Sequence, residues 1–195
     1  GLQPVGRPYD RLLEDLTGSP ELARFDLAAA SMLEPKARGA LNIEGLCATA
    51  DGHLWIGFRN PIPGGKALLV PLFNPAEVVT GGTAELGDPM LVDLGGLGIR
   101  DMVFAGGRFV IAAGSYNGGN EAALFEWQGP GAKPERWPGL NLKGWNPEAI
   151  FPVPGAGALD FHLLSDDGSR KVAGKDCKDW EDPALKRFRG MWIRR

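Results

Sequence analysis

Two kinds of hydrophobic periodicity divide the chain near residue 40. Before that point apolar residues recur every three or four positions, as on one face of a helix. After it, apolar and polar residues alternate in short runs separated by glycine, proline, asparagine and aspartate, which is typical of strands joined by turns. We therefore expect a helical segment at residues 1–40 and a β domain at residues 41–195.

The segment before residue 40 predicts two helices. Ser19 is placed to cap the second helix, with Pro20 at its first position, and Pro35 ends it. The apolar faces are Tyr9, Leu12, Leu13 and Leu16 in the first helix, and Leu22, Phe25, Ala29, Met32 and Leu33 in the second. We expect the pair to pack against the side of the β domain, and no residue in it suggests chemistry.

The β domain opens with the stretch NIEGLCATADGHLWIGFRNP. Two alternating runs, Glu44 to Ala50 and His53 to Arg59, flank the pair Asp51-Gly52. An Asp-Gly pair favours a two-residue turn because both positions tolerate positive φ. The stretch is therefore predicted to be a β-hairpin.

The hairpin pattern returns twice. IRDMVFA and RFVIAAG flank Gly106-Gly107, and NPEAIFPVP and ALDFHLLS flank the glycines at 155–157. Further strands are predicted at Lys66–Phe73, Met90–Leu94, Ala122–Gln128, Glu135–Pro138 and Arg189–Ile193, with a solvated polar insertion at residues 166–186. These assignments divide the β domain into units at 41–95, 96–140 and 141–195.

Aligning the hairpins places three acids, Glu44, Asp101 and Glu148, at matching positions 57 and 47 residues apart. Such spacing is close to the ~40–50 residues of a propeller blade. The predicted fold is an all-β, propeller-like radial array of at least three four-stranded blades with a short helical N-terminal segment. Because propellers close with about four to eight blades, either N-terminal blades precede this chain or a second chain completes the ring. We favour the first explanation.

Composition and charge narrow the range of partners. A net charge of −3 does not suggest a nucleic-acid partner. No apolar run approaches the ~20 residues that cross a membrane, and the sequence does not open with a signal peptide. Two cysteines do not indicate a disulfide framework, and Cys47 is expected to pack in a strand. We therefore expect no nucleic acid and no membrane among the partners.

Four motifs, LNIEGL, IGFRNP, GIRDM and NPEAI, occur in order along the chain. Together they resemble the bacterial domain-of-unknown-function family 3616, which is similar to esterase-like, phytase-type propellers. The resemblance covers roughly residues 39–195. It implies a propeller fold, without an established activity.

The three acids are the first candidate site. If Glu44, Asp101 and Glu148 converge at the mouth of a propeller channel, their mutual repulsion needs compensation, and at ~5 Å it amounts to roughly 3 kcal/mol per pair. Calcium takes ~6–8 oxygen ligands and suits such a group. Asn42 and Asn146, each two residues before an acid, would add amide oxygens. We therefore predict calcium as a cofactor held by these acids.

A structural role for the same acids is the main alternative. Each acid at a strand start can accept backbone N–H bonds from the neighbouring blade, or pair with Arg59 or Arg100. Those arginines are also candidate binding residues, since guanidinium groups bind phosphate in a bidentate way.

Two functions from different classes follow. The first is calcium-assisted hydrolysis of phosphate or carboxylate esters, in which the metal lowers the pKa of bound water; the partner is then a small-molecule ester. The second is a non-catalytic propeller scaffold for protein or ligand binding, with a homodimer as the expected assembly if the chain is complete. The sequence has no G-x-S-x-G nucleophile motif. Its histidines, His53 and His162, are expected to be structural or solvated.

Overall fold

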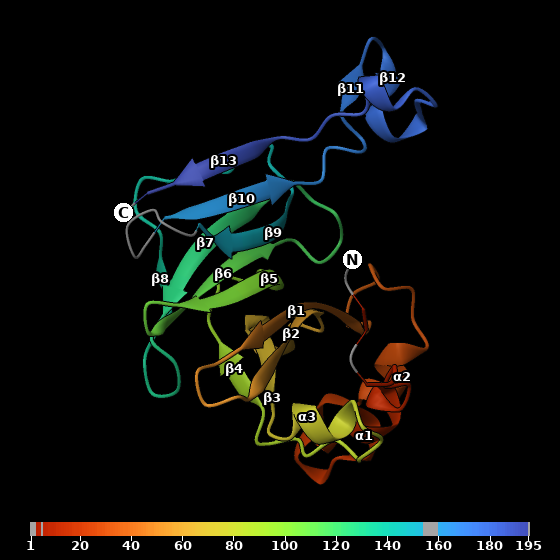
Figure 1. Cartoon of the computed structure of the whole chain (residues 1–195), viewed down its shortest axis with the longest axis vertical. Helices are drawn as coiled ribbons and strands as arrows, with labels where there is room; N and C mark the ends of the chain where they lie inside the picture. The colour runs from red at the N-terminus through yellow and green to blue at the C-terminus, as the bar shows by residue number, and fades with distance from the viewer. Residues whose placement is uncertain (1–2, 5, 154–159, 195) are drawn as a thin grey trace.

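The protein is described by a computed structural model that covers residues 3–4, 6–153 and 160–194. Its described part is mostly β-structure arranged in small antiparallel sheets, with few helices (Figure 1). The first sheet has the strand order β1-β2-β3-β4, in which each strand pairs with the next along the chain. Its strands are β1 (Asn42–Ala48), β2 (Leu54–Asn60), β3 (Ala67–Leu72) and β4 (Met90–Val92). Asp51 and Gly52 lie in the connection between β1 and β2, but this connection is longer than the predicted two-residue turn. Ala48 pairs with Leu54, the Thr49 N–H donates to the His53 carbonyl, and Gly52 has a positive φ of 84° whereas Asp51 does not.

The second sheet repeats this order with β5-β6-β7-β8. Its strands are β5 (Gly98–Ala105), β6 (Arg108–Gly114), β7 (Ala122–Trp127) and β8 (Glu135–Arg136). The predicted Gly106-Gly107 turn connects β5 to β6, and both glycines have positive φ. Two of the three expected four-stranded units are therefore present in the predicted order.

The third sheet differs from the prediction, because it has three strands rather than four among the described residues, in the order β13-β10-β9. These strands are β9 (Pro147–Pro152), β10 (Phe161–Ser165) and β13 (Gly190–Ile193). The expected glycine turn at 155–157 lies outside the described residues. Residues 166–189 leave the sheet between β10 and β13.

The predicted solvated loop at 166–186 carries structure of its own. It forms a two-stranded ribbon, β11 (Lys171–Val172) and β12 (Lys175–Asp176), followed by 3₁₀ turns at Cys177–Asp179 and Pro183–Leu185. Figure 1 shows this ribbon standing away from the sheets. Cys177 is buried in it, and its Sγ accepts the backbone N–H of Arg187 at 3.0 Å. The buried Cys177 side chain helps to stabilise the folded structure of this insertion, although its charged composition predicted a solvated loop.

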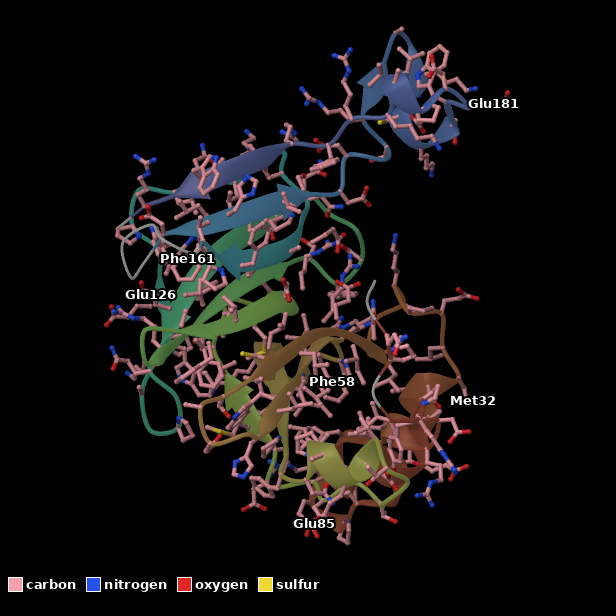
Figure 2. All side chains as sticks on the ribbon, viewed as in Figure 1. Met32, Phe58, Glu85, Glu126, Phe161 and Glu181 are labelled. Carbon is pink, nitrogen blue, oxygen red and sulfur yellow. The ribbon has the colours of Figure 1, made fainter. Side chains whose placement is uncertain are left out.

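The three sheets stack face to face, with one apolar core in each interface. Between the first and second sheets, Leu69, Ile99, Ile111 and Trp127 belong to one cluster of buried side chains. Between the second and third sheets, a second cluster includes Val110, Leu124, Phe161 and Ile193. Figure 2 shows Phe161 inside the stack.

The N-terminal helices cover the opposite face of the first sheet. Helix α1 (Leu12–Gly18) and helix α2 (Leu27–Ser31) contribute Leu16 and Leu27 to a third core with Phe58 of β2 (Figure 2). A short helix α3 (Pro75–Val78) adds Val78 to the same core. The predicted packing of a helical pair on the side of the β domain is what the described residues show.

The second helix is shorter than predicted. A 3₁₀ helix at Pro20–Phe25 ends at Asp26, which adopts a left-handed conformation with φ of 46°. The Asp26 side chain then accepts the backbone N–H of Ala29 and caps α2. This break rotates the apolar stripe, so that Met32 is 85% exposed (Figure 2). Ser19, the predicted cap, makes no capping hydrogen bond to the backbone and donates to Glu21 instead.

The stacked sheets do not close into a ring in the described part of the chain. The helices cover one end of the stack, and the outer face of the third sheet lies at the other end (Figure 1). That outer face carries Phe151, His162 and Trp192, which are paired side by side across the three strands. His162 stacks on Trp192 with ring centroids 4.6 Å apart and meets Phe151 edge-on at 5.4 Å. The expectation of a structural His162 agrees with these contacts.

Candidate functional site

Four charged residues lie at irregularities in strand pairing near the start of the hairpins. Ile43 pairs with Phe58 and Gly45 with Gly57, so Glu44 has no residue opposite it. Asn42 pairs with Asn60, which leaves Arg59 as the extra residue on β2. Such bulges turn a side chain out of the regular alternation. They place these charges between sheets, rather than on one face.

The same irregularity recurs in the other two sheets. Ile99 pairs with Ala113 and Asp101 with Ala112, so Arg100 is the extra residue of β5. On β9, Pro147 pairs with Ser165 and Ala149 with Leu164, so Glu148 is extra. We call Glu44, Arg59, Arg100 and Glu148 the bulge cluster.

The pairing corrects the predicted alignment of acids. The residue equivalent to Glu44 and Glu148 is Arg100, and Asp101 is one position further along. A one-residue step along a strand moves a side chain to the opposite face. The repeated position therefore carries negative, positive and negative charges in the three sheets, and the three acids do not meet as one group.

The bulge cluster forms a chain of ion pairs. Arg59 Nη1 donates to Glu44 Oε1 at 2.7 Å, and Arg100 Nη2 donates to Glu148 Oε1. Glu44 Oε2 lies 3.7 Å from Arg100 Nε, and both atoms are buried without a hydrogen bond. The order of charges from the first sheet to the third is thus Arg59, Glu44, Arg100, Glu148.

The guanidinium groups in this chain are the buried members. Arg59 and Arg100 are 4% and 3% exposed, whereas the Glu148 side chain is 36% exposed. Burial, and next the positive charge of Arg59, hold the pKa of Arg100 below its ordinary value. Arg59 also donates from Nε and Nη2 to the backbone carbonyl of Ser115, at 3.2 and 3.1 Å. Arg59 is therefore held both by the Glu44 carboxylate and by the Ser115 backbone.

Asp101 lies apart from the bulge cluster and bonds to backbone only. Its Oδ1 accepts the N–H of Met102 at 2.8 Å, and its Oδ2 accepts the N–H of Ile150 at 2.7 Å. Burial raises the pKa of Asp101, while the two backbone hydrogen bonds oppose that rise. The hydrogen bond from Ile150 joins the second sheet to the third. This is the structural role, a backbone N–H bond from a neighbouring unit, that the sequence suggested as the alternative for the acids.

The two asparagines flank the glutamates but present their amide nitrogens. Asn42 Nδ2 donates to Glu44 Oε1 at 3.2 Å, and Asn146 Nδ2 to Glu148 Oε1 at 3.4 Å. Across the described residues, no group of three or more histidine, cysteine, aspartate or glutamate side chains is arranged to hold a metal. The carboxylates of the predicted calcium ligands are bonded to arginines or to backbone amides.

Sequence reasoning missed two contributors to this region. The Ser115 carbonyl, which binds Arg59, is a backbone group that no side-chain motif reveals. A buried Asp167 and a half-buried Arg189 form a second ion pair close to the third sheet, with Arg189 Nε 2.7 Å from Asp167 Oδ2. The insertion between them separates the pair by 22 residues, so their spacing gave no signal.

Together, the fold and the site define a mostly β protein of stacked antiparallel sheets, whose charged strand starts are bonded to one another across sheet boundaries. The chain belongs to the family described as Protein of unknown function (DUF3616), whose model matches residues 7–137. The match takes in the helices and the first two sheets. It begins earlier and ends sooner than the predicted range of 39–195.

Other comparisons add no relative. No curated protein and no solved structure matches the chain. Among the described residues, no helix has the length and apolar character needed to cross a membrane.

Proposed function

We propose that this chain is a non-catalytic interaction scaffold and that its three sheets are units of a propeller-like radial array. The array is supported by the way in which each sheet packs against the next one. Each sheet carries a bulge at the same point of its first strand. In the first and second sheets, the residue three positions after the bulged one lies on the face that packs against the next sheet. Cys47 of the first sheet and Val103 of the second lie on those faces.

A single observation supports the scaffold function best. The acids that would perform chemistry are bonded to groups of the chain itself: Glu44 and Glu148 to arginines, and Asp101 to two backbone amides. A general base or nucleophile needs access to a substrate atom within hydrogen-bond reach. Carboxylates held in this way instead join neighbouring sheets.

The test is an assay on the two ester classes that the family resemblance suggests. The protein is incubated with 4-nitrophenyl phosphate and 4-nitrophenyl acetate, each with and without added calcium. We expect no release of 4-nitrophenol above the buffer rate. Turnover that exceeds the buffer rate and falls in the variant Glu148→Gln would overturn the scaffold proposal in favour of a hydrolase.

The calcium site that the sequence suggested is tested by measuring the melting temperature. A calcium ion would have to replace the arginines that now bind Glu44 and Glu148. We therefore expect the melting temperature to be the same in EDTA and in millimolar calcium. An increase with calcium that disappears in Glu44→Gln would restore the metal hypothesis.

A scaffold needs a contact surface, and we propose that the outer face of the third sheet binds a second copy of this chain. Phe151 on this face occupies the position that Cys47 and Val103 hold on the faces already packed against a following sheet. Trp192 beside it is 57% exposed. The face therefore continues a packing mode that this chain uses twice.

Light scattering tests the homodimer. We expect a dimer mass that shifts toward the monomer in Trp192→Ser. Phe188→Ser is the matched control, since Phe188 is 69% exposed but lies outside the three strands. A wild-type protein that is monomeric at high micromolar concentration would overturn the second-copy proposal.

A further inference from the structure

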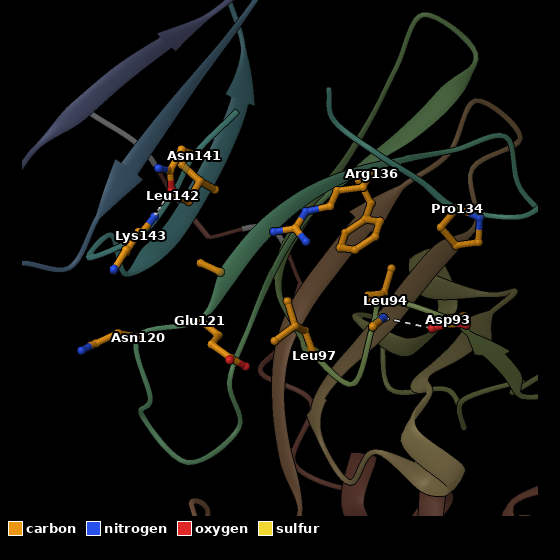
Figure 3. Close-up of a pocket in the computed structure, with 13 residues that line it drawn as sticks. Asp93, Leu94, Leu97, Asn120, Glu121, Pro134, Arg136, Asn141, Leu142 and Lys143 are labelled. Atoms are coloured by element: carbon orange, nitrogen blue, oxygen red, sulfur yellow. Dashed lines mark hydrogen bonds between the residues drawn. The ribbon is translucent and has the colours of Figure 1, made fainter. Parts of the chain in front are cut away.

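A pocket of about 820 Å³ lies beside the second sheet (Figure 3). Its walls come from the segment between β4 and β5, from strands β7 and β8, and from the segment that precedes β9. This volume is in the range of sites for small organic ligands, about 300–1,000 Å³. None of the residues of the bulge cluster lines it.

Buried apolar side chains form the base of the pocket. Leu94, Leu97 and Phe125 are at most 8% exposed and belong to the core between the first two sheets. Leu142, on the opposite wall, belongs to the core between the second and third sheets. Because these side chains are held by two cores, the apolar surface is rigid and suits a ring or a short hydrocarbon chain.

Two cations line the pocket above this base. Arg136 of β8 and Lys143 are both exposed, and in the described part of the chain neither side chain makes a hydrogen bond or ion pair. Figure 3 shows the Arg136 side chain reaching from β8 toward Leu142 and Lys143. Other arginines, such as Arg59, Arg100 and Arg189, are bonded to carboxylates. Arg136 is thus available to a ligand.

The pocket also contains two acids, which limit the kind of anion that fits. Asp93 is engaged, because its Oδ1 accepts the backbone N–H of Gly95 at 2.9 Å. Glu121 lies on the β7 side (Figure 3) and forms no ion pair with Arg136 among the described residues. A ligand therefore meets positive charge at Arg136 and Lys143, and negative charge away from them.

We propose that this pocket binds a small organic anion with an apolar body, such as an aromatic carboxylate or phosphate monoester. The anionic group would be held by Arg136, whose fork of N–H donors matches either anion in a bidentate way, with Lys143 as a second cation. The apolar body would cover Leu97 and Phe125. This site is separate from the scaffold contacts, so its failure would leave the proposed function untouched.

Isothermal titration calorimetry with three naphthalene probes tests the proposal. The probes are 1-naphthoate, 1-naphthyl phosphate and 1-naphthol, which share one ring system and differ in charge. We expect one or both anions to bind at least tenfold more tightly than the neutral naphthol. Binding by the phosphate alone would identify phosphate monoesters as the class, and binding by both would extend it to carboxylates. Absence of anion binding, or equal binding of naphthol, would overturn the proposal.

Variants of exposed residues locate the site without disturbing the core. Arg136→Met is expected to weaken anion binding at least tenfold, and Lys143→Met to weaken it less. Lys133→Met is the control, because Lys133 is exposed, carries the same charge and does not line the pocket. Glu121→Gln should tighten anion binding or leave it unchanged, since it removes a negative charge. An equal effect of Arg136→Met and Lys133→Met, or weaker binding in Glu121→Gln, would overturn the proposal.

Discussion

The Asp101 carboxylate of β5 accepts the backbone N–H of Ile150 on β9 at 2.7 Å, which joins two neighbouring sheets directly. Its second oxygen accepts the N–H of Met102 within its own sheet. The half-buried side chain thus uses both of its oxygens to accept backbone N–H groups. A carboxylate suits this place because it is an acceptor at both oxygens.

The substitution Asp101→Asn removes one of these acceptors. An amide presents a single oxygen, so one buried backbone N–H would lose its partner, at a cost of about 1–3 kcal/mol. We expect urea denaturation to show a loss of this size. Asp93→Asn is the control, because Asp93 accepts one N–H in an exposed turn and should cost less. Equal losses in both variants would contradict the role of Asp101 between sheets.

Glu44 lies between two buried guanidinium groups, Arg59 and Arg100. Its neutralisation in Glu44→Gln leaves their charges facing each other, and breaking a buried pair costs about 3–5 kcal/mol. Since the Glu44 side chain is 22% exposed, we expect about 3 kcal/mol in the free energy of unfolding. The double variant Glu44→Gln with Arg59→Met should recover part of the loss. Simple addition of the two single effects would contradict the pairing.

Gly98 allows the second sheet to approach the first. A Cβ atom at this position would stand 1.9 Å from the backbone oxygen of Arg59, which is a severe overlap with backbone. We expect Gly98→Ala to reduce the free energy of unfolding by about 3 kcal/mol or more. The control is Gly18→Ala, where a Cβ meets no atom within 4 Å, so stability should not fall. A neutral result for Gly98→Ala would contradict the close contact between the sheets.

Asp167 provides a pH-dependent contribution to stability. Hydrogen bonds from Arg189 are the main cause that holds the pKa of Asp167 below its ordinary value. A carboxyl group with a lowered folded-state pKa adds stability above its unfolded pKa, near 3.9, and loses it as the pH falls through the folded value. Asp167→Asn should therefore cost about 2 kcal/mol at pH 7. The difference from wild type should shrink below about pH 4.

Urea unfolding at several pH values checks this prediction. Asp182→Asn is the control, since Asp182 lies in an exposed turn where its side chain accepts one backbone N–H. A constant difference between wild type and Asp167→Asn from pH 7 down to pH 2 would contradict the ion pair with Arg189.

Cys47 is expected to be unreactive in the folded protein. It is buried between the first two sheets, and burial raises the pKa of its thiol to about 11. At pH 8 only about one thiol in a thousand would be the reactive thiolate. Iodoacetamide followed by mass spectrometry should label Cys47 in urea but not in buffer. Rapid labelling of Cys47 in buffer would contradict its packing.

Local patterns in the sequence predicted the hairpins well. Gly106-Gly107 forms the predicted two-residue turn, in which both glycines have positive φ. Asp51-Gly52 lies in a longer connection, where Gly52 has a positive φ and Asp51 does not. The alternation around them identified the strands of the first two sheets within a few residues. By contrast, the second helix was predicted too long, since the left-handed Asp26 that breaks it is compatible with a helical pattern.

The candidate site could be predicted only in part. Glu44, Arg59, Arg100 and Glu148 were all singled out, and the alternative of ion pairs with the arginines agrees with the structure. The alignment that joined Asp101 to the two glutamates was wrong by one residue. Bulges shift pairing by one position, and the amino-acid pattern on either side of a bulge gives little sign of where the extra residue lies.

The sequence by itself determined the local elements of this protein, because turn chemistry and apolar alternation act over a few residues. Only the tertiary structure decided which charges face one another and which face of the third sheet stays uncovered with its aromatic side chains. It also decided that Arg136 and Lys143 share a pocket. These relationships depend on how whole sheets stack, and stacking brings together residues that are distant along the chain.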